Sequence, residues 1–317
     1  MITKKTRLRQ ILLEKEFAEY KQYLLPWKKG FLLHLKLKSL QSVWNVDSIV
    51  DGLNYMEHLQ AQGRQIFYPI YDVDEIKNNP SLREQVLFHF PVKAKTKFVV
   101  ICAGGGYESV CSFVEAFPVA QRLNELGFQA FVVNYRVGKD AVYPNPMDDL
   151  ANAVSFILNH ADEFNIEKEN YSVMGFSAGG HLAGSFGTEQ IGYRKYGLPK
   201  PGAMLLAYPV ITMGEYTHEG SRKYLLGEAQ QKNSKICDEF SLEKLVTKEY
   251  PPCYLWQCNQ DPTVPIENSK MMTDALKRNG VAYQYEVFQG KAHGWGLGKG
   301  TTAESWLVQA VEFWKNT

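Results

Sequence analysis

The chain has 317 residues, of which 45% are hydrophobic and 22% are charged, and its formal net charge is +1. This length supports a large buried core, and the composition is that of an ordinary globular protein. A nearly balanced charge gives no general attraction to nucleic acid or to anionic lipid, so we expect neither as a partner.

Three features of the sequence predict a cytoplasmic protein. No run approaches the ~20 apolar residues that a membrane-spanning helix needs. The apolar run at 11–13 is too short for the core of a signal peptide. The five cysteines are odd in number and lack metal-type C-x-x-C pairs, which favours free thiols in a reducing compartment. The oligomeric state stays open, and a homo-oligomer is compatible with the sequence.

The sequence predicts a helical extension at residues 1–63. A first helix is indicated by apolar residues at spacings of 4, 3 and 4, which place them on one helix face: Leu13, Phe17, Tyr20 and Leu24. A second helix is expected to begin at Asp47 as N-cap and to end at Gly63. The extension could act as a partial lid. Because its first forty residues are rich in Lys and Arg, it could instead dock a partner, although the simpler interpretation is a solvated helix face.

The sequence predicts a catalytic α/β domain at residues 64–317. Eight apolar, strand-like runs occur at 66–71, 86–90, 98–102, 130–135, 171–174, 203–208, 253–258 and 283–288. From the third run onward they alternate with helical patterns, the clearest at 113–126, 147–164, 266–279 and 302–314. Strands separated by helices indicate a mainly parallel sheet covered on both faces. The first two runs could form an antiparallel hairpin at one edge. Functional sites of such sheets lie beyond the carboxyl ends of the strands.

The pentapeptide G-F-S-A-G places Ser177 directly after the fifth run and before a short helical pattern. This is the context of a nucleophile elbow, in which a tight strand-to-helix turn exposes the serine hydroxyl. The N-terminus of the following helix would direct N–H groups toward negative charge. Glycine-rich turns after strands also bind phosphate, so the motif alone leaves both interpretations open.

A second glycine-rich loop, A-G-G-G-Y at 103–107, follows the third run. Acyl transfer needs N–H donors for the oxyanion of the tetrahedral intermediate. Gly105, Gly106 and Ala178, the residue after the serine, are the candidate donors. The alternative is a dinucleotide-binding turn, but the loop lacks the G-x-G-x-x-G spacing.

Asp261 and His293 each follow one of the last two strand-like runs, which completes the chain order Ser, Asp, His of a hydrolase triad. His293 is the candidate general base. Glu267, near the start of the next helical pattern, is an alternative acid. Asp148 and Asp149 are interpreted as first-turn charges that favour a helix dipole.

As a set, A-G-G-G-Y, N-Y-R-V, Y-S-V-M-G-F-S-A-G-G-H-L-A, A-Y-P-V-I-T, N-Q-D-P-T-V-P and K-A-H-G-W-G resemble bacterial α/β-hydrolases of the acetyl esterase/acetylxylan esterase type. The resemblance runs from Val86 to the C-terminus. It implies Ser177 as nucleophile, His293 as base and then acid, and Asp261 as orienting carboxylate, with the oxyanion donors named above. The loop departs from the family in having Ala103 where relatives often have proline or histidine, and the N-terminal segment has no match.

The resemblance implies an α/β-hydrolase fold and a serine esterase that acts on short-acyl esters, chiefly acetyl esters of carbohydrates, through an acyl-enzyme. Such a reaction needs no metal and no other cofactor. Tyr107 and Trp295 could offer flat surfaces to a sugar ring, or could simply pack locally. The polar segment 211–251, which contains His218, could form a pocket rim that binds substrate, or a solvated insertion.

Three rival functions remain. A prolyl-oligopeptidase-like peptidase shares the triad order, but 63 leading residues are too few for a propeller. Thioester or formamide hydrolysis would use the same triad. A non-catalytic binding module would be expected to lack a triad member, and this chain has all three.

Overall fold

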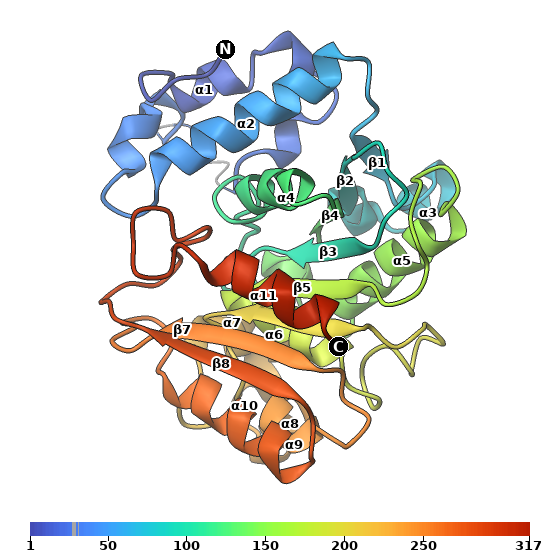
Figure 1. Ribbon diagram of the computed structural model, residues 1–317, viewed down its shortest axis with the longest axis vertical. Helices are drawn as coiled ribbons and strands as arrows, with labels where there is room; N and C mark the ends of the chain where they lie inside the picture. The colour runs from blue at the N-terminus through green and yellow to red at the C-terminus, as the bar shows by residue number, and fades with distance from the viewer. Residues whose placement is uncertain (27–29, 31) are drawn as a thin grey trace.

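The chain forms one eight-stranded sheet with helices on both faces, as Figure 1 shows for the computed structural model. The structure describes residues 1–26, 30 and 32–317. The strands are β1 (Phe67–Pro69), β2 (Val86–Phe90), β3 (Phe98–Cys102), β4 (Gln129–Asn134), β5 (Ser172–Phe176), β6 (Ala203–Ala207), β7 (Cys253–Cys258) and β8 (Tyr283–Phe288). The α-helices are α1 (Leu8–Ile11), α2 (Val46–Ala61), α3 (Val73–Asn78), α4 (Ala116–Glu125), α5 (Asn145–Asn159), α6 (Ser177–Phe186), α7 (Glu219–Gln230), α8 (Ser234–Glu239), α9 (Leu242–Leu245), α10 (Glu267–Arg278) and α11 (Trp306–Lys315).

The strand order is β1-β2-β4-β3-β5-β6-β7-β8, which confirms the predicted α/β fold. Strands β4, β3, β5, β6, β7 and β8 pair in parallel, whereas β1 pairs with β2, and β2 with β4, in antiparallel fashion. The two first strands therefore lie at one edge, as expected. Because β3, β5, β7 and β8 run in one direction, the loops that follow them meet at one end of the sheet.

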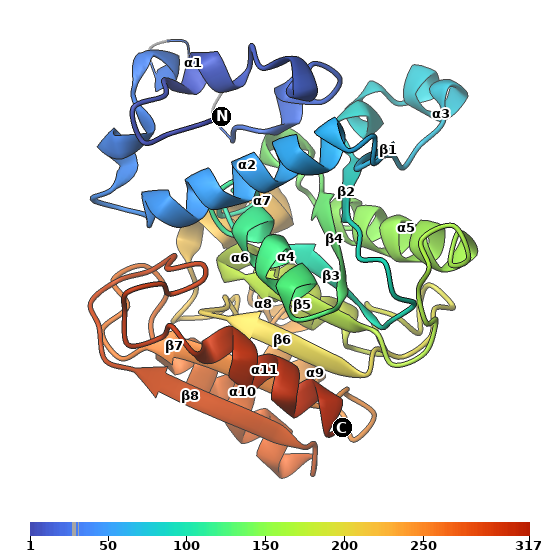
Figure 2. The same ribbon diagram turned by 45° about the horizontal axis from the view of Figure 1, so that its top comes forward.

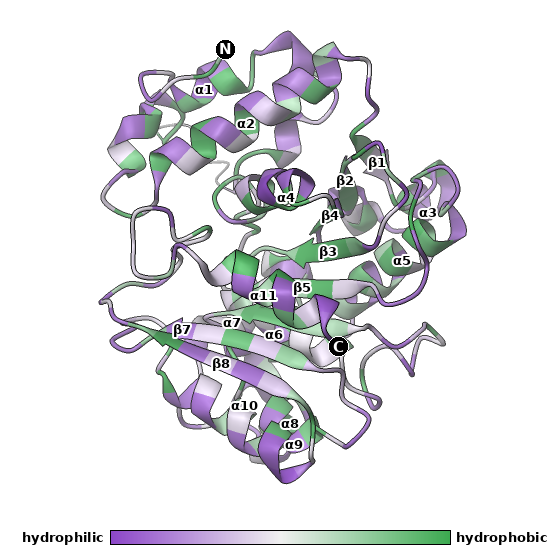
Figure 3. Ribbon diagram, in the orientation of Figure 1, coloured by the Kyte–Doolittle hydropathy of each residue, from purple (hydrophilic) through white to green (hydrophobic). Residues whose placement is uncertain are grey.

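Alternation along the strands divides the core into two halves. In β3, Val99 and Ile101 pack with α2, α4 and α11, while Phe98, Val100 and Cys102 pack with α5, α6 and α10. Successive side chains of a strand point to opposite faces, so an apolar run buried on both sides serves both halves. Figure 3 shows β3 as largely hydrophobic and the edge strand β8, which is only partly buried, as mostly hydrophilic or neutral.

The N-terminal region packs on the α4 side of the sheet. Figures 1 and 2 show α2 lying across α4, and Gly52 of α2 lies against Phe117 and Pro118. The buried side chains of residues 1–63 join the same apolar cluster as Phe88 and Phe90 of β2. The division of the chain into residues 1–63 and 64–317 stays a prediction, but the two parts share a core.

The first predicted helix is wrong. Residues 13–24 form two short 3₁₀ turns, Lys15–Phe17 and Lys21–Tyr23, closed by bonds such as Phe17 N–H to the Glu14 carbonyl. Three of the four apolar residues still reach the core, but Leu13 is 77% exposed. Two successive 3₁₀ turns, of which each buries one or two residues, can give the same spacing of apolar residues as one continuous helix. Lys28 and Lys29, two of the basic residues in this region, lie outside the described residues.

Helix α2 begins slightly earlier than predicted. Its N-cap is Asn45, whose side chain accepts the Ser48 N–H, and not Asp47. Asp47 lies in the first turn and pairs with Lys4 at 2.8 Å. An acidic residue in the first turn and a capping residue just before it both favour this helix start, so the sequence signal was correct to within two positions.

None of the helices in the described part of the chain is long and apolar enough to span a membrane.

Candidate active site

Ser177 stands at the sharp turn between β5 and α6. Its backbone has a positive φ of 53°, which is uncommon for a residue other than glycine and is found at functional turns. Gly179 makes the turn feasible, because a Cβ at this position would overlap the carbonyl oxygens of Cys102 and Ala103 at the end of β3. Helix α6 can therefore pack directly on the loop that follows β3, with Ser177 at the carboxyl end of β5.

The structure brings Ser177, His293 and Asp261 together. The Asp261 carboxylate can only accept, so Nδ1 of His293 carries a proton and donates it to Oδ2 at 2.7 Å. This leaves Nε2 as the acceptor for the Ser177 hydroxyl, at 2.8 Å. The Asp261 side chain is fully buried, and that of His293 is 15% exposed. In this arrangement an imidazole nitrogen can take the proton of the serine hydroxyl while a carboxylate orients the ring.

Asp261 is held by its own loop. Its Oδ1 accepts the N–H groups of Thr263 and Val264, at 2.8 and 3.0 Å, and its Oδ2 accepts Gln257 Nε2 at 3.3 Å. The alternative acid, Glu267, instead lies at the start of α10 with its carboxylate 3.9 Å from Lys270. Geometry therefore favours Asp261 as the third member.

The loop after β3 carries Gly105 at φ 129° and Gly106 at φ 67°. Gly105 requires the absence of a side chain, because a Cβ there would overlap the Ser109 carbonyl. Its own carbonyl accepts the N–H groups of Glu108 and Ser109, which closes the loop on itself. Ala178 is the second residue of α6, where a helix N–H has no intrahelical acceptor. Among the described residues, none accepts a hydrogen bond from the N–H groups of Gly105, Gly106 or Ala178.

Two side chains that the sequence analysis missed connect the site loops. Glu115 is 5% exposed and accepts the Gly104 N–H at 2.6 Å and the Tyr208 hydroxyl at 2.9 Å. Tyr208 in turn accepts the Gly296 N–H at 3.1 Å, and its ring centroid lies 4.9 Å from that of His293. Burial raises the pKa of Glu115, against the effect of these hydrogen bonds and of His293. A single acidic residue within the apolar run F-V-E-A-F was the available signal.

The three predicted substrate contacts are placed differently. Tyr107 is 1% exposed, and its hydroxyl lies 3.0 Å from Nδ1 of the buried His181. This burial favours local packing of Tyr107 over a sugar platform. Trp295 is half-buried, with its ring over Gly290, and this favours the packing alternative.

His218 does border the site. Its ring lies against Gly106, with Cε1 3.4 Å from where a Cβ on that glycine would stand. Nδ1 accepts the Ser221 N–H at 3.2 Å, so in the neutral ring the proton is on Nε2. Burial, together with nearby His293, lowers the pKa of His218 and favours this neutral donor. The segment 211–251 is no solvated insertion, because it folds into α7, α8 and α9 and buries residues such as Leu225 and Leu242.

Asp149 is more than a first-turn charge. It is fully buried and pairs with Arg136 at 2.9 Å, and its Oδ1 accepts the Tyr71 hydroxyl at 3.0 Å. Arg136 follows β4 and lines a hollow of about 890 Å³ next to the loop after β3. Polar side chains from three parts of the chain face this hollow, among them Gln22, Glu108, Asn134, Lys139 and Asp140.

The N-terminal region touches the loop that carries His293. Asn45 Nδ2 donates to the Lys299 carbonyl at 3.0 Å, and Lys299 pairs with Asp51 at 3.2 Å. The Trp44 indole nitrogen is 3.5 Å from where a Cβ on Gly294 would lie. The extension thus braces this loop from the side opposite β8.

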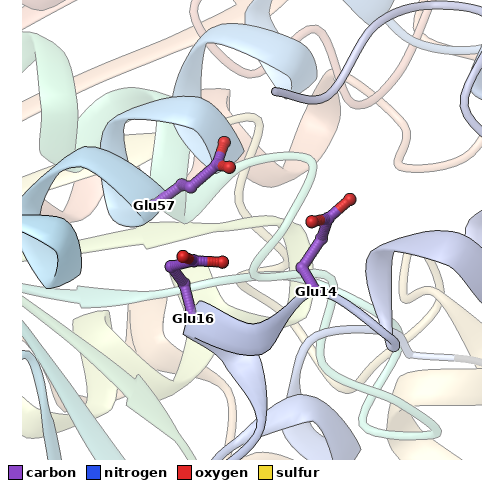
Figure 4. A group of neighbouring side chains, drawn as sticks. All are labelled: Glu14, Glu16 and Glu57. Atoms are coloured by element: carbon purple, nitrogen blue, oxygen red, sulfur yellow. The ribbon is translucent and has the colours of Figure 1, made fainter.

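In the described part of the chain, one group of three acidic side chains has oxygens within 4.8 Å of one another: Glu14, Glu16 and Glu57 (Figure 4). All three are partly exposed, and Glu57 pairs with the N-terminal amine at 3.2 Å. Acidic groups of this kind are common at protein surfaces, and this one lies in the N-terminal region, away from the triad.

Several known proteins are similar to this chain. The family model BD-FAE matches residues 88–197. Endo-1,4-β-xylanase B of Butyrivibrio fibrisolvens is 35% identical over 209 residues, which is 63% of this chain and 32% of that protein. Acetylxylan esterase of Xylanibacter ruminicola is 28% identical over 237 residues, which is 73% of this chain and 48% of that protein. The chain thus spans less than half the length of either curated relative.

Among solved structures, an acetyl ester-xyloside bifunctional hydrolase from Caldicellulosiruptor lactoaceticus is 30% identical, with a TM-score of 0.69. The match covers 79% of this chain and 95% of that one. A thermophilic esterase from Thermogutta terrifontis, with a TM-score of 0.63 at 22% identity, has the same fold.

Proposed function

The chain belongs to the α/β-hydrolase family of the BD-FAE type, and from this premise we propose that it is a serine esterase. Its substrates would be short-acyl esters, chiefly acetyl esters of carbohydrates. The observation that carries the proposal is the continuous hydrogen-bond chain from Ser177 through His293 to Asp261, next to the glycine-rich loop after β3.

Acylation follows from the protonation states that this geometry imposes. Nε2 of His293 takes the proton of the Ser177 hydroxyl as Oγ attacks the ester carbonyl. Asp261 keeps the ring in the required tautomer and stabilises the imidazolium that forms. The carbonyl oxygen becomes an oxyanion, for which the N–H groups of Gly105, Gly106 and Ala178 are the proposed donors. His293 then gives its proton to the departing alcohol oxygen, which leaves an acyl-enzyme.

Deacylation repeats these steps with water as the nucleophile. His293 removes a proton from the water as its oxygen attacks the acyl carbon, and the Ser177 oxygen leaves with that proton. The balance is one ester and one water converted to one acid and one alcohol. No metal or organic cofactor takes part in this scheme.

Two observations support a carbohydrate as the alcohol part. Relatives that match this chain are named acetylxylan esterase and acetyl ester-xyloside bifunctional hydrolase. The hollow next to the oxyanion loop is lined by side chains that can bond to sugar hydroxyls, such as Gln22, Asn134 and Arg136. We assign His218 as a donor from the other side of the loop, through its Nε2–H.

Five free thiols support a reducing compartment such as the cytoplasm.

The peptidase alternative is less well supported, since the described part of residues 1–63 forms helical turns packed on α4 and not a second domain over the site. Thioester and formamide hydrolysis would use the same atoms, so only substrate tests separate them from ester hydrolysis.

The test compares wild type with Ser177→Ala on p-nitrophenyl acetate, butyrate and octanoate, and on acetylated xylo-oligosaccharides. We expect preference for acetyl, release of acetate from the sugar, and a loss of at least about 1,000-fold in kcat for the variant. Unchanged rates in Ser177→Ala would refute the nucleophile. Cleavage of the synthetic esters without acetate release would refute the carbohydrate substrate and leave the triad standing.

A further inference from the structure

Glu115 is a buried carboxylate beneath the site and is not a member of the triad. It precedes α4 and bonds to Gly104, in the loop after β3, and to Tyr208, which follows β6. We propose that Glu115 and Tyr208 are positioning residues, which hold the oxyanion loop and the histidine loop at a fixed separation. The proposal rests on the serine-esterase function given above.

On the oxyanion side, Glu115 acts through the backbone. Oε2 accepts the Gly104 N–H at 2.6 Å, the short distance of a charge-assisted hydrogen bond. Gly104 immediately precedes the proposed donors Gly105 and Gly106. A bond that fixes the peptide before them limits the direction in which their N–H groups can point. Electrostatic stabilisation of an oxyanion depends on donors that are already aligned before the reaction.

On the histidine side, Tyr208 transmits the contact. Its hydroxyl donates to Oε1 of Glu115 and accepts the Gly296 N–H, three residues after His293. Its ring packs edge-on against His293, at an interplanar angle of 67°. Trp306 Nε1 holds the same loop by donating to the Gly296 carbonyl at 2.9 Å. Tyr208 thus positions His293 through its ring and holds the loop of His293 through its hydroxyl, and Glu115 in turn fixes that hydroxyl.

Glu115 and Tyr208 together form a hydrogen-bonded bridge between the oxyanion loop and the histidine loop. Both parts of this bridge serve the alignment of the reacting groups. Ser177 Oγ, the oxyanion donors and Nε2 of His293 must converge on one substrate carbon, and an error of about 1 Å can cost roughly 100-fold in rate. Bridges built from buried polar groups keep such geometry only while every member is bonded. Removal of either residue therefore loosens both loops.

Glu115→Gln and Tyr208→Phe test the bridge in the full chain. Glutamine keeps the shape and one acceptor but replaces the other oxygen with a donor, while phenylalanine keeps the ring and removes the hydroxyl. Tyr250→Phe is the matched control, because its buried hydroxyl donates to the Gly184 carbonyl on the other face of the sheet, at 2.9 Å. The readouts are kcat and KM for p-nitrophenyl acetate, the affinity for phenylboronic acid as a tetrahedral adduct of the serine, and thermal unfolding.

We expect kcat to fall by about 10- to 100-fold in Tyr208→Phe and by about 10-fold in Glu115→Gln, with KM within about 2-fold. Boronate affinity should fall in parallel, and the double variant should be no worse than Tyr208→Phe, since both changes break one bridge. Tyr250→Phe should lose stability and keep kcat.

Losses in kcat no larger than in the control, or single effects that multiply in the double variant, would overturn the proposal. Should Tyr208→Phe not fold, Glu115→Gln alone decides by the same criterion. A wild type that hydrolyses no ester would instead overturn the proposed function, so the two failures are distinguishable.

Discussion

Ser177 and His293 meet at 2.8 Å, but the chain holds them in different ways. Ser177 is fixed by backbone: a positive φ of 53°, the start of a helix and a glycine without room for a side chain. His293 lies in a glycine-rich loop and is fixed by side chains, namely Asp261, Tyr208 and, through Tyr208, Glu115. Changes near the serine should therefore act on folding, whereas changes near the histidine should act on rate.

Asp261→Asn should produce the largest effect on rate, because it changes a side chain that fixes His293. Asparagine keeps an oxygen for the Thr263 and Val264 N–H groups but no longer orients His293 in the required tautomer. We expect kcat to fall by roughly 1,000- to 10,000-fold with a melting temperature close to that of the wild type. Steady-state kinetics and circular dichroism check this together. A variant that loses rate only because it unfolds would contradict the distinction.

Gly179→Ala tests the backbone-held member. Its Cβ would overlap the Cys102 and Ala103 carbonyl oxygens, and backbone cannot move away as a flexible side chain can. We expect a loss of at least about 3 kcal/mol in the free energy of unfolding, with activity lost in proportion to folded protein. Urea denaturation measures the first, and active-site titration of the soluble fraction the second. Gly127→Ala, at a position with open space around the Cβ and φ 91°, gives for comparison the cost of backbone strain without atomic overlap.

The pH dependence of stability should reveal the histidine that supports the oxyanion loop. Burial lowers the pKa of His181 to about 4, and likewise that of His89. Between pH ~6.5 and ~4 the unfolded chain binds more protons than the folded one, so stability is complete above that interval and is lost as pH falls through it. Each histidine should contribute roughly 3 kcal/mol to this loss.

Two variants separate stability from function here. His181→Gln and His89→Gln should each flatten the pH dependence of urea midpoints. Only His181→Gln should also lower kcat, because His181 contacts Tyr107 next to the oxyanion glycines, while His89 bonds Gln129 in the core. Equal kcat values in the two variants would show that Tyr107 needs no such support.

Asn45→Ala should have the smallest effect. It removes the N-cap of α2 and the bond to the Lys299 carbonyl, which joins the N-terminal region to the histidine loop. We expect a loss of about 1 kcal/mol in stability and a change in kcat of less than about 2-fold. Asp47→Ala, which changes the first turn but leaves the cap, should cost less. A fall in kcat of tenfold or more would mean that the extension positions His293.

The sequence by itself determined the sheet and the chain order of the site. Six of the eight strands match the predicted runs to within one residue at each end, because alternation and apolar content are properties of a short stretch. The same holds for Ser177, Asp261 and His293, since each follows its own strand and parallel strands bring such positions to one end.

Only the tertiary structure decided how these loops are held. Glu115 and Tyr208 are 93 residues apart, and nothing local to either indicates the other. Tyr107 looked like a platform next to a catalytic loop, but its burial depends on His181 and Tyr135, which come from other elements. In residues 13–24, two separate turns produce the same spacing of apolar residues as a helix. The buried side chains of these turns pack against α2 and β2, which are distant in sequence, so the local pattern did not reveal the turns. Local periodicity specifies elements, whereas contacts between distant residues specify the geometry of the site.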